Sequence, residues 1–214
     1  MSTVGADGVG TGVWDGGGSP FAISSKKLGM WLFIISDALT FTALLMAYSY
    51  LRVSSETWPA PFHFYPSIIA STVMTLFLLT SSITMVMAVS AAHKGNVAGA
   101  FKWLLATIGG GMAFLALHAN EWMTLIEEGL RPFENPWGNP LFGATFFTIT
   151  GLHMLHVTIG VGVLLVIAIG FKKGKYTADN VEIGGLYWHF VDLVWMFVFP
   201  LVYLLSVALE SAPH

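Results

Sequence analysis

The chain is 214 residues long, with 55% hydrophobic and only 10% charged residues and a formal net charge of −3. A soluble domain usually has about 25% charged residues, so 9 basic and 12 acidic side chains are too few to cover a globule of this size in water. This composition excludes a soluble enzyme, a disordered regulator and a nucleic-acid binder, which would need a basic face. The absence of cysteine excludes disulfides, thiolate zinc sites and cysteine-ligated iron–sulfur clusters.

The chain begins with a glycine-rich segment. Seven glycines fall within the first 20 residues, which contain no basic residue and no apolar stretch of the kind found in a signal peptide. We therefore expect residues 1–26 to form a flexible tail and residues 27–210 to form one transmembrane domain.

Five long apolar stretches follow, and each approaches or exceeds the ~20 residues that a helix needs to cross ~30 Å of hydrocarbon. Their expected bounds are Leu28–Leu51, Ser67–Ala92, Phe101–Asn120, Leu141–Phe171 and Ile183–Leu209. The short period-2 segments of a membrane β-barrel are absent. The sequence thus predicts an all-α integral membrane bundle of five transmembrane helices. Four tryptophans near the expected span ends are interpreted as interface anchors: Trp103, Trp122, Trp137 and Trp188.

Basic residues predict the orientation of the spans. Arg52 and Arg131 fall on one side of the membrane, and seven lysines fall on the other: Lys26, Lys27, Lys94, Lys102, Lys172, Lys173 and Lys175. Because basic residues are retained on the inner side, the N-terminus is expected to be cytoplasmic and His214 to lie outside.

Several ionisable residues fall within or at the ends of the spans, where an unpartnered charge costs a few kcal/mol or more. They are Asp37, Glu121, Asp192, His118, His153, His156 and His189. Asp37 is expected near mid-membrane, and no lysine or arginine lies deep enough to pair with it. We expect it to carry a proton or to bond to histidine or water. A polar group of the fourth or fifth span is its expected contact, with His153, His156 and His189 as candidates.

Two i, i+3 pairs are expected on the last two spans, His153 with His156 and His189 with Asp192. The histidines could make hydrogen bonds between helices, or they could act as ligands or proton carriers. Glu121 is interpreted as a structural residue at the outer mouth of the third span.

Composition and spacing leave three functional classes open. The first is a di-haem cytochrome b, which needs histidines on different helices at matching depths. The second is a transporter, although broken helices and an inverted repeat are missing. The third is an accessory subunit whose acids and histidines assist a neighbouring redox protein.

Local motifs choose among these classes. Residues Tyr187–Trp195 read YWHFVDLVW and closely resemble the Y-W-H-F-V-D-x-V-W signature of subunit III of haem–copper terminal oxidases. Residues Gly143–Gly160 are similar to that family's G-S-x-F-F…T-G-F-H-G-L-H-V-x-x-G run, and Gly29–Asp37 is similar to its W-x-F-I-x-S-E segment. Asn120–Trp122 resembles its Y-E-Y motif. The motifs occur in the family's order over Lys27–Leu209.

Two departures from the family pattern are visible. Asp37 replaces the family's carbodiimide-reactive glutamate, as in the quinol-oxidase branch, so the resemblance leaves the electron donor open between cytochrome c and quinol. The long form of the family has seven helices, and this chain has room for five.

The resemblance implies an accessory subunit of a complex that reduces dioxygen to water and translocates protons. Such a subunit carries no haem or copper, which are expected in partner subunits. It packs beside subunit I, stabilises that subunit and helps to sustain proton uptake. Subunit II and phospholipid are further expected partners, and the bacterial inner membrane is the expected location.

No catalytic residue is expected. The buried polar positions that the resemblance matches, and that would shape the proton or lipid environment, are Asp37, Glu121, His153, His156, His189 and Asp192. A subunit III-like chain of a nitric oxide reductase is the alternative.

Overall fold

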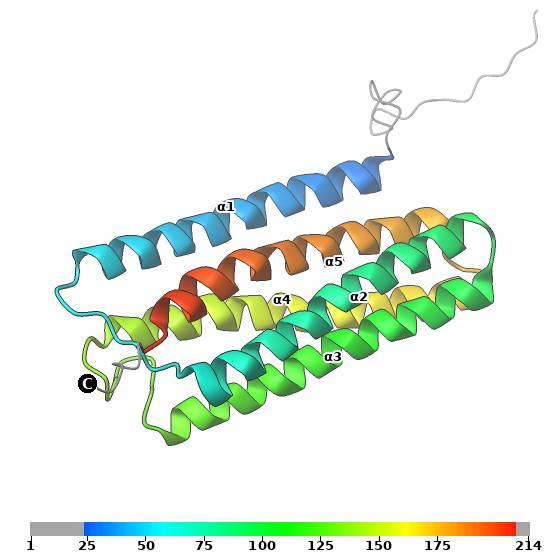
Figure 1. The fold of residues 1–214 in the computed structure, drawn as a ribbon. Coiled ribbons are helices and arrows are strands. Elements are labelled where there is room, and N and C mark those ends of the chain that lie inside the picture. The colour runs from blue at the N-terminus through cyan, green and yellow to red at the C-terminus, as the bar shows by residue number, and fades with distance from the viewer. Residues whose placement is uncertain (1–23, 209–214) are drawn as a thin grey trace, which may run out of the picture.

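The computed structural model describes residues 24–208, and within them the chain forms five long helices. These are α1 (Ser25–Ser54), α2 (Ile69–His93), α3 (Val97–Glu127), α4 (Leu141–Lys172) and α5 (Ala178–Val198). Figure 1 shows them side by side along one common direction. All five are long and apolar enough to cross a membrane, so the chain is an all-α multi-pass membrane protein.

The helix bounds extend the predicted spans by a few residues at most ends. α1 begins at Ser25, so Ser25 and Lys26 belong to the helix rather than to the expected tail. The rest of that tail, residues 1–23, and residues 209–214 lie outside the described residues. Two ends differ more. α3 continues seven residues past the expected end at Asn120, to Glu127, and the regular part of α5 ends at Val198, eleven residues before the expected Leu209.

Two helices continue beyond their regular part. The five-residue π-turn Phe64–Ile68 precedes α2. Another π-turn, Phe199–Tyr203, and the 3₁₀ turn Leu204–Ser206 extend α5. Pro200 lies in the second π-turn, and a proline there removes an amide donor from the regular ladder. The end of the chain then returns to the loop after α1, where the amide of Phe62 donates to the carbonyl of Ser206 over 3.3 Å.

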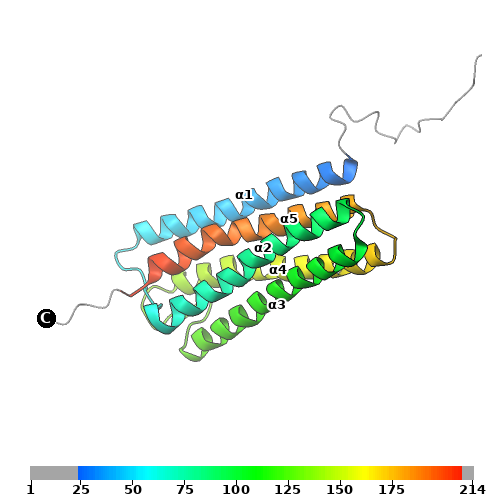
Figure 2. The same cartoon turned by 45° about the vertical axis from the view of Figure 1, so that its right-hand side comes forward.

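Helices α2, α3, α4 and α5 form a tightly packed four-helix bundle, in which each of α2 and α4 contacts both α3 and α5 (Figures 1 and 2). Glycines allow the close approach at its centre. A Cβ at Gly111 would come within 2.5 Å of the Trp188 ring, and one at Gly160 within 3.0 Å of the same ring. Trp188 is fully buried and donates its indole N–H to Ser81 over 3.0 Å. Its interpretation as an interface anchor is therefore wrong.

Helix α1 lies outside this bundle, along α5 and against part of α4 (Figures 1 and 2). It buries only Ile34, Phe41 and Tyr48, which are seven residues apart and form a single stripe. An apolar cavity of about 440 Å³ lies between α1 and α5, lined by residues that include Leu45, Met46 and Phe197. α1 therefore touches the rest of the chain along one narrow line.

Candidate functional site

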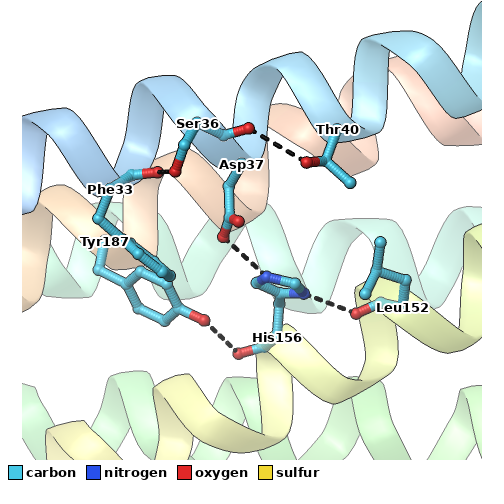
Figure 3. Close-up of polar contacts among 7 residues, drawn as sticks. All are labelled: Phe33, Ser36, Asp37, Thr40, Leu152, His156 and Tyr187. Atoms are coloured by element: carbon cyan, nitrogen blue, oxygen red, sulfur yellow. Dashed lines mark hydrogen bonds and ion pairs between the residues drawn. The ribbon is translucent and has the colours of Figure 1, made fainter.

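Asp37 and His156 form the central polar contact between α1 and the bundle. The Nε2 atom of His156 lies 2.8 Å from Oδ2 of Asp37, and both side chains are largely buried. Figure 3 shows the carboxylate pointing from α1 toward the imidazole of α4. His156 is the sixteenth of the 32 residues of α4, so the contact lies close to the middle of the membrane span. The predicted contact of Asp37 with a polar group of the fourth span is confirmed.

The second ring nitrogen of His156 fixes the number of protons in this contact. Nδ1 lies 2.8 Å from the carbonyl oxygen of Leu152, and a carbonyl only accepts, so Nδ1 carries a proton. The contact of Nε2 with the carboxyl group then requires one further proton, held by either partner. The pair is an imidazolium with a carboxylate, or an imidazole with a carboxylic acid. Either form has no net charge, which keeps the cost of burial low.

Aromatic side chains from α1 and α5 lie next to the pair. Phe41 packs edge-on against the imidazole of His156, with ring centroids 5.3 Å apart. The hydroxyl of Tyr187 on α5 donates to the carbonyl of His156 over 3.1 Å. On α1, Ser36 and Thr40 bond to carbonyls of their own helix, so neither competes for the carboxylate (Figure 3).

Polar contacts also fasten α1 near both ends. At its start, Lys27 bonds to Glu182 of α5, and His93 of α2 lies 3.4 Å from the other oxygen of that carboxylate. At its end, Arg52 donates to Ser206 over 3.1 Å and to the carbonyl of Leu205. Together with Asp37–His156, these contacts join α1 to the other helices at three heights.

His153 differs from His156 in its hydrogen bonding, although only three residues separate them. It is fully buried, and its ring stacks on Trp195 with centroids 4.9 Å apart. His118 of α3 packs against the same Trp195 ring at 5.3 Å. None of the four nitrogens of these two histidines has a hydrogen-bond partner within the described residues. Both rings pack edge-on against Phe41, as an i, i+3 pair on one helix face should. Among the described residues, however, His156 bonds to another helix and His153 does not.

His189 and Asp192 both lie next to Ser82 of α2. Nδ1 of His189 lies 2.7 Å from the hydroxyl of Ser82 on α2, so this histidine links two helices. Asp192 is buried, and its carboxyl oxygens have no hydrogen-bond partner among residues 24–208. The two side chains thus share a helix face, as their i, i+3 spacing predicts, without a hydrogen bond between them.

Glu121 occupies a separate site near the C-terminal end of α3. Its Oε1 accepts from the hydroxyl of Ser71 on α2 over 2.6 Å, and its Oε2 accepts from Tyr203 over 2.8 Å. Because α3 extends to Glu127, Glu121 lies within the helix, six residues before its end. Sequence reasoning missed Ser71, Ser82 and Tyr203 as partners, since hydroxyl residues in apolar segments give no signal of which helix they face.

No three histidine, aspartate or glutamate side chains gather closely enough within residues 24–208 to hold a metal ion. The polar groups of the spans are thus distributed over separate sites. At Asp37–His156 a proton is shared between an acid and a histidine across the interface of α1 and α4.

Comparison with known proteins agrees with the resemblance in the motifs. The family model described as "Cytochrome c oxidase subunit III" matches residues 5–207. The chain is 36% identical to "Cytochrome c oxidase subunit 3" of Thermostichus vulcanus, over 85% of this chain and 88% of that protein. It is 34% identical to "Cytochrome bo(3) ubiquinol oxidase subunit 3" of Pseudomonas aeruginosa, over 83% of this chain and 84% of that protein.

A third relative, "Cytochrome c oxidase subunit 3" of Alkalihalophilus pseudofirmus, is 31% identical over 86% of this chain and 88% of that protein. These matches do not favour a nitric oxide reductase chain or a membrane cytochrome b. The chain belongs to the cytochrome c oxidase subunit III family, whose role is that of an accessory oxidase subunit.

Proposed function

We propose that this chain packs beside subunit I of a haem–copper oxidase, stabilises that subunit and sustains proton uptake during turnover. The named relatives are third subunits of cytochrome c and quinol oxidases, which supports assembly with subunits I and II. In this proposal the haem and copper that reduce dioxygen belong to the partners, and this chain contributes no catalytic residue.

The Asp37–His156 pair is the observation that carries the proton-handling part of the proposal. It is a neutral unit that holds one exchangeable proton near mid-membrane. Asp37 belongs to α1, whose outer face is largely exposed. A pair of this kind can release a proton to a neighbouring acceptor and regain it, while Nδ1 keeps its own proton and donates it to the Leu152 carbonyl. The other buried polar residues are proposed to shape the surrounding environment: Glu121, His153, His189 and Asp192.

The test compares Asp37→Asn with wild type in the assembled oxidase. Asparagine keeps nearly the same shape and can still bond to His156, so assembly and the initial rate of oxygen consumption should be retained. We expect a lower proton stoichiometry or faster inactivation over many turnovers. The matched control is Asp179→Asn, the same chemical change at an exposed position in the first turn of α5. If Asp37→Asn and wild type agree in rate, proton stoichiometry and inactivation, Asp37 is a packing residue only.

The orientation with the N-terminus in the cytoplasm is part of the same proposal and rests on the lysine distribution. Single cysteines can be placed at Ser25, Ser54, Asn96, Asn135 and Ala178, because the chain has no cysteine of its own. An impermeant maleimide added to intact cells should label positions 54 and 135 only. Labelling at position 96 or 178 would contradict the proposed orientation.

The absence of a redox cofactor from this chain is likewise proposed. Reduced-minus-oxidised spectra of the chain purified without its partners should show no haem band. A stoichiometric band would overturn the proposal and restore the cytochrome b alternative.

Phospholipid is proposed as a further partner of this chain. The apolar cavity between α1 and α5 supports this, because it has the lining expected for an acyl chain.

A further inference from the structure

A second cavity, with a volume of about 600 Å³, opens at the end of the bundle where α2 begins and α3 ends. Pro61, Met74 and Leu117 give it apolar walls, and Glu121 contributes a carboxyl group to its lining. This site is separate from Asp37–His156, and a ligand there would give Glu121 a specific role beyond the general one proposed above.

The carboxyl group of Glu121 retains the capacity to bind a ligand. Ser71 and Tyr203 each donate one hydrogen bond to it. A carboxylate has about four acceptor positions, so two are free after these contacts. The hydroxyl groups also hold the side chain in one place, from α2 on one side and from the π-turn after α5 on the other.

The charge of the lining favours a cation. The lining contains two carboxyl groups, those of Glu121 and Glu128. No lysine or arginine is found among the described residues that line the cavity. His63 is the other titratable residue of the lining. Phe62 and Trp137 add aromatic rings, whose faces attract organic cations.

The depth of Glu121 matches that of a lipid headgroup. The 31 residues of α3 span about 46 Å at 1.5 Å per residue, so the helix extends ~8 Å beyond each side of a ~30 Å hydrocarbon layer. Glu121 lies six residues before the end of α3, about 9 Å along its axis. It therefore lies close to the boundary between hydrocarbon and headgroups, where a lipid ammonium group can reach it.

We propose that this cavity binds a primary ammonium group, with Glu121 as its main ligand and Glu128 as a second carboxylate at the rim. A phosphatidylethanolamine headgroup and a free amine share this chemistry. The apolar walls and the interfacial depth favour the lipid.

The experiment uses the assembled oxidase in detergent, equilibrated with equal amounts of phosphatidylethanolamine and phosphatidylglycerol. Lipids retained after detergent exchange are counted by native mass spectrometry. Wild type should retain one more phosphatidylethanolamine than Glu121→Gln, with affinity at this site lowered about tenfold in the variant because a charge-assisted contact is lost. Retained phosphatidylglycerol should not change.

Two further variants keep the test decisive. Glu128→Gln changes an exposed side chain and should lower retention by about threefold without affecting assembly. Glu134→Gln, an exposed glutamate outside the cavity lining, is the control and should behave as wild type. Equal retention of phosphatidylethanolamine by wild type, Glu121→Gln and Glu128→Gln would overturn the proposal, as would loss of both lipids together.

Free ethanolamine distinguishes the two sources of the ammonium group. If the lipid remains bound against a large excess of ethanolamine, the ligand is a lipid headgroup. If ethanolamine displaces it and binds to wild type but not to Glu121→Gln, the site recognises free amines.

Discussion

Helix α1 buries three of its 30 residues, whereas α5 buries eleven of its 21. Both are apolar enough to span a membrane, so hydrophobicity does not distinguish them. They differ in how they meet their neighbours. α5 is enclosed by α2 and α4 and packs bulky rings against small residues, while α1 touches the other helices along the stripe of Ile34, Phe41 and Tyr48.

This difference shows what holds helices together in lipid. Lipid tails are as apolar as leucine, so association depends on close packing and on hydrogen bonds between helices. The bundle of α2–α5 has both, for example where Gly111 admits the ring of Trp188 and Ser81 accepts its N–H. α1 has little packing, and its polar contacts with α4, α5 and the segment after α5 must therefore contribute a larger share of its attachment.

The largest effect should come from truncating a side chain inside the bundle. Trp188→Ala removes a fully buried ring, and the cavity and lost contacts should lower the free energy of unfolding in detergent by about 3 kcal/mol. Trp31→Ala on α1, where the side chain is 45% exposed, should change it little. Equal losses for the two variants would show that α1 is packed as closely as the bundle.

The next largest effect should come from Asp37→Leu. It leaves Nε2 of His156 without its partner, at a cost of about 1–3 kcal/mol, and α1 should move away from the bundle. Spin labels on cysteines at Met46 and Phe197, on either side of the α1–α5 cavity, would report a longer or broader distance. Thr42→Val is the control, because that exposed hydroxyl bonds only within α1. An unchanged distance in Asp37→Leu would mean that apolar contacts suffice.

A smaller effect is expected near the C-terminal end of α1, at Tyr48. Tyr48→Phe removes the hydroxyl that lies 3.1 Å from Ser206, and should lower stability by about 0.5–1.5 kcal/mol. Tyr50→Phe makes the same change two residues later, on a side chain that is 73% exposed, and should be neutral. Chemical unfolding of the two variants side by side measures the difference. A loss in both would point to a general effect of the substitution on α1.

The smallest effect is expected for the ion pair at the start of α1. Lys27 and Glu182 are partly exposed, with about a third of each side chain accessible, so Lys27→Met should cost no more than about 1 kcal/mol and less at high salt. Lys26→Met, at an exposed position next to it, controls for the loss of a charge. A larger or salt-independent cost would place this contact in a less hydrated environment than its exposure indicates.

Apolar length and motif order predict the five spans and the family, because a helix must satisfy its own backbone in lipid. They also reduce the partners of Asp37 to three histidines. Which histidine bonds to Asp37 depends on where α1 lies against α4, and no local pattern contains that information. The interpretation of Trp188 fails for a related reason: α5 begins at Ala178, so the residue lies ten positions inside the helix and faces Gly111 and Gly160.

Asp192 and Glu121 also show that the sequence predicts the depth of a residue but not its bonding partners. Their depths are readable from the sequence, but the hydroxyl partners of Glu121 come from segments 50 and 82 residues away in the chain. Spacing alone pairs Asp192 with His189, whereas packing against α2 gives His189 a different partner, Ser82. Spacing on one helix thus predicts which side chains are near each other, and bonding depends on the helices around them.

A double-mutant cycle on Asp37 and His156 tests most directly whether their contact attaches α1. The free energy of unfolding is measured for wild type, Asp37→Leu, His156→Leu and the double variant in the same detergent. The shared proton and the 2.8 Å contact predict a coupling energy of about 1–2 kcal/mol, so the second substitution should cost much less once the first is present. If the two losses add to within about 0.5 kcal/mol, the two residues act independently, and their contact is not what attaches α1 to the bundle.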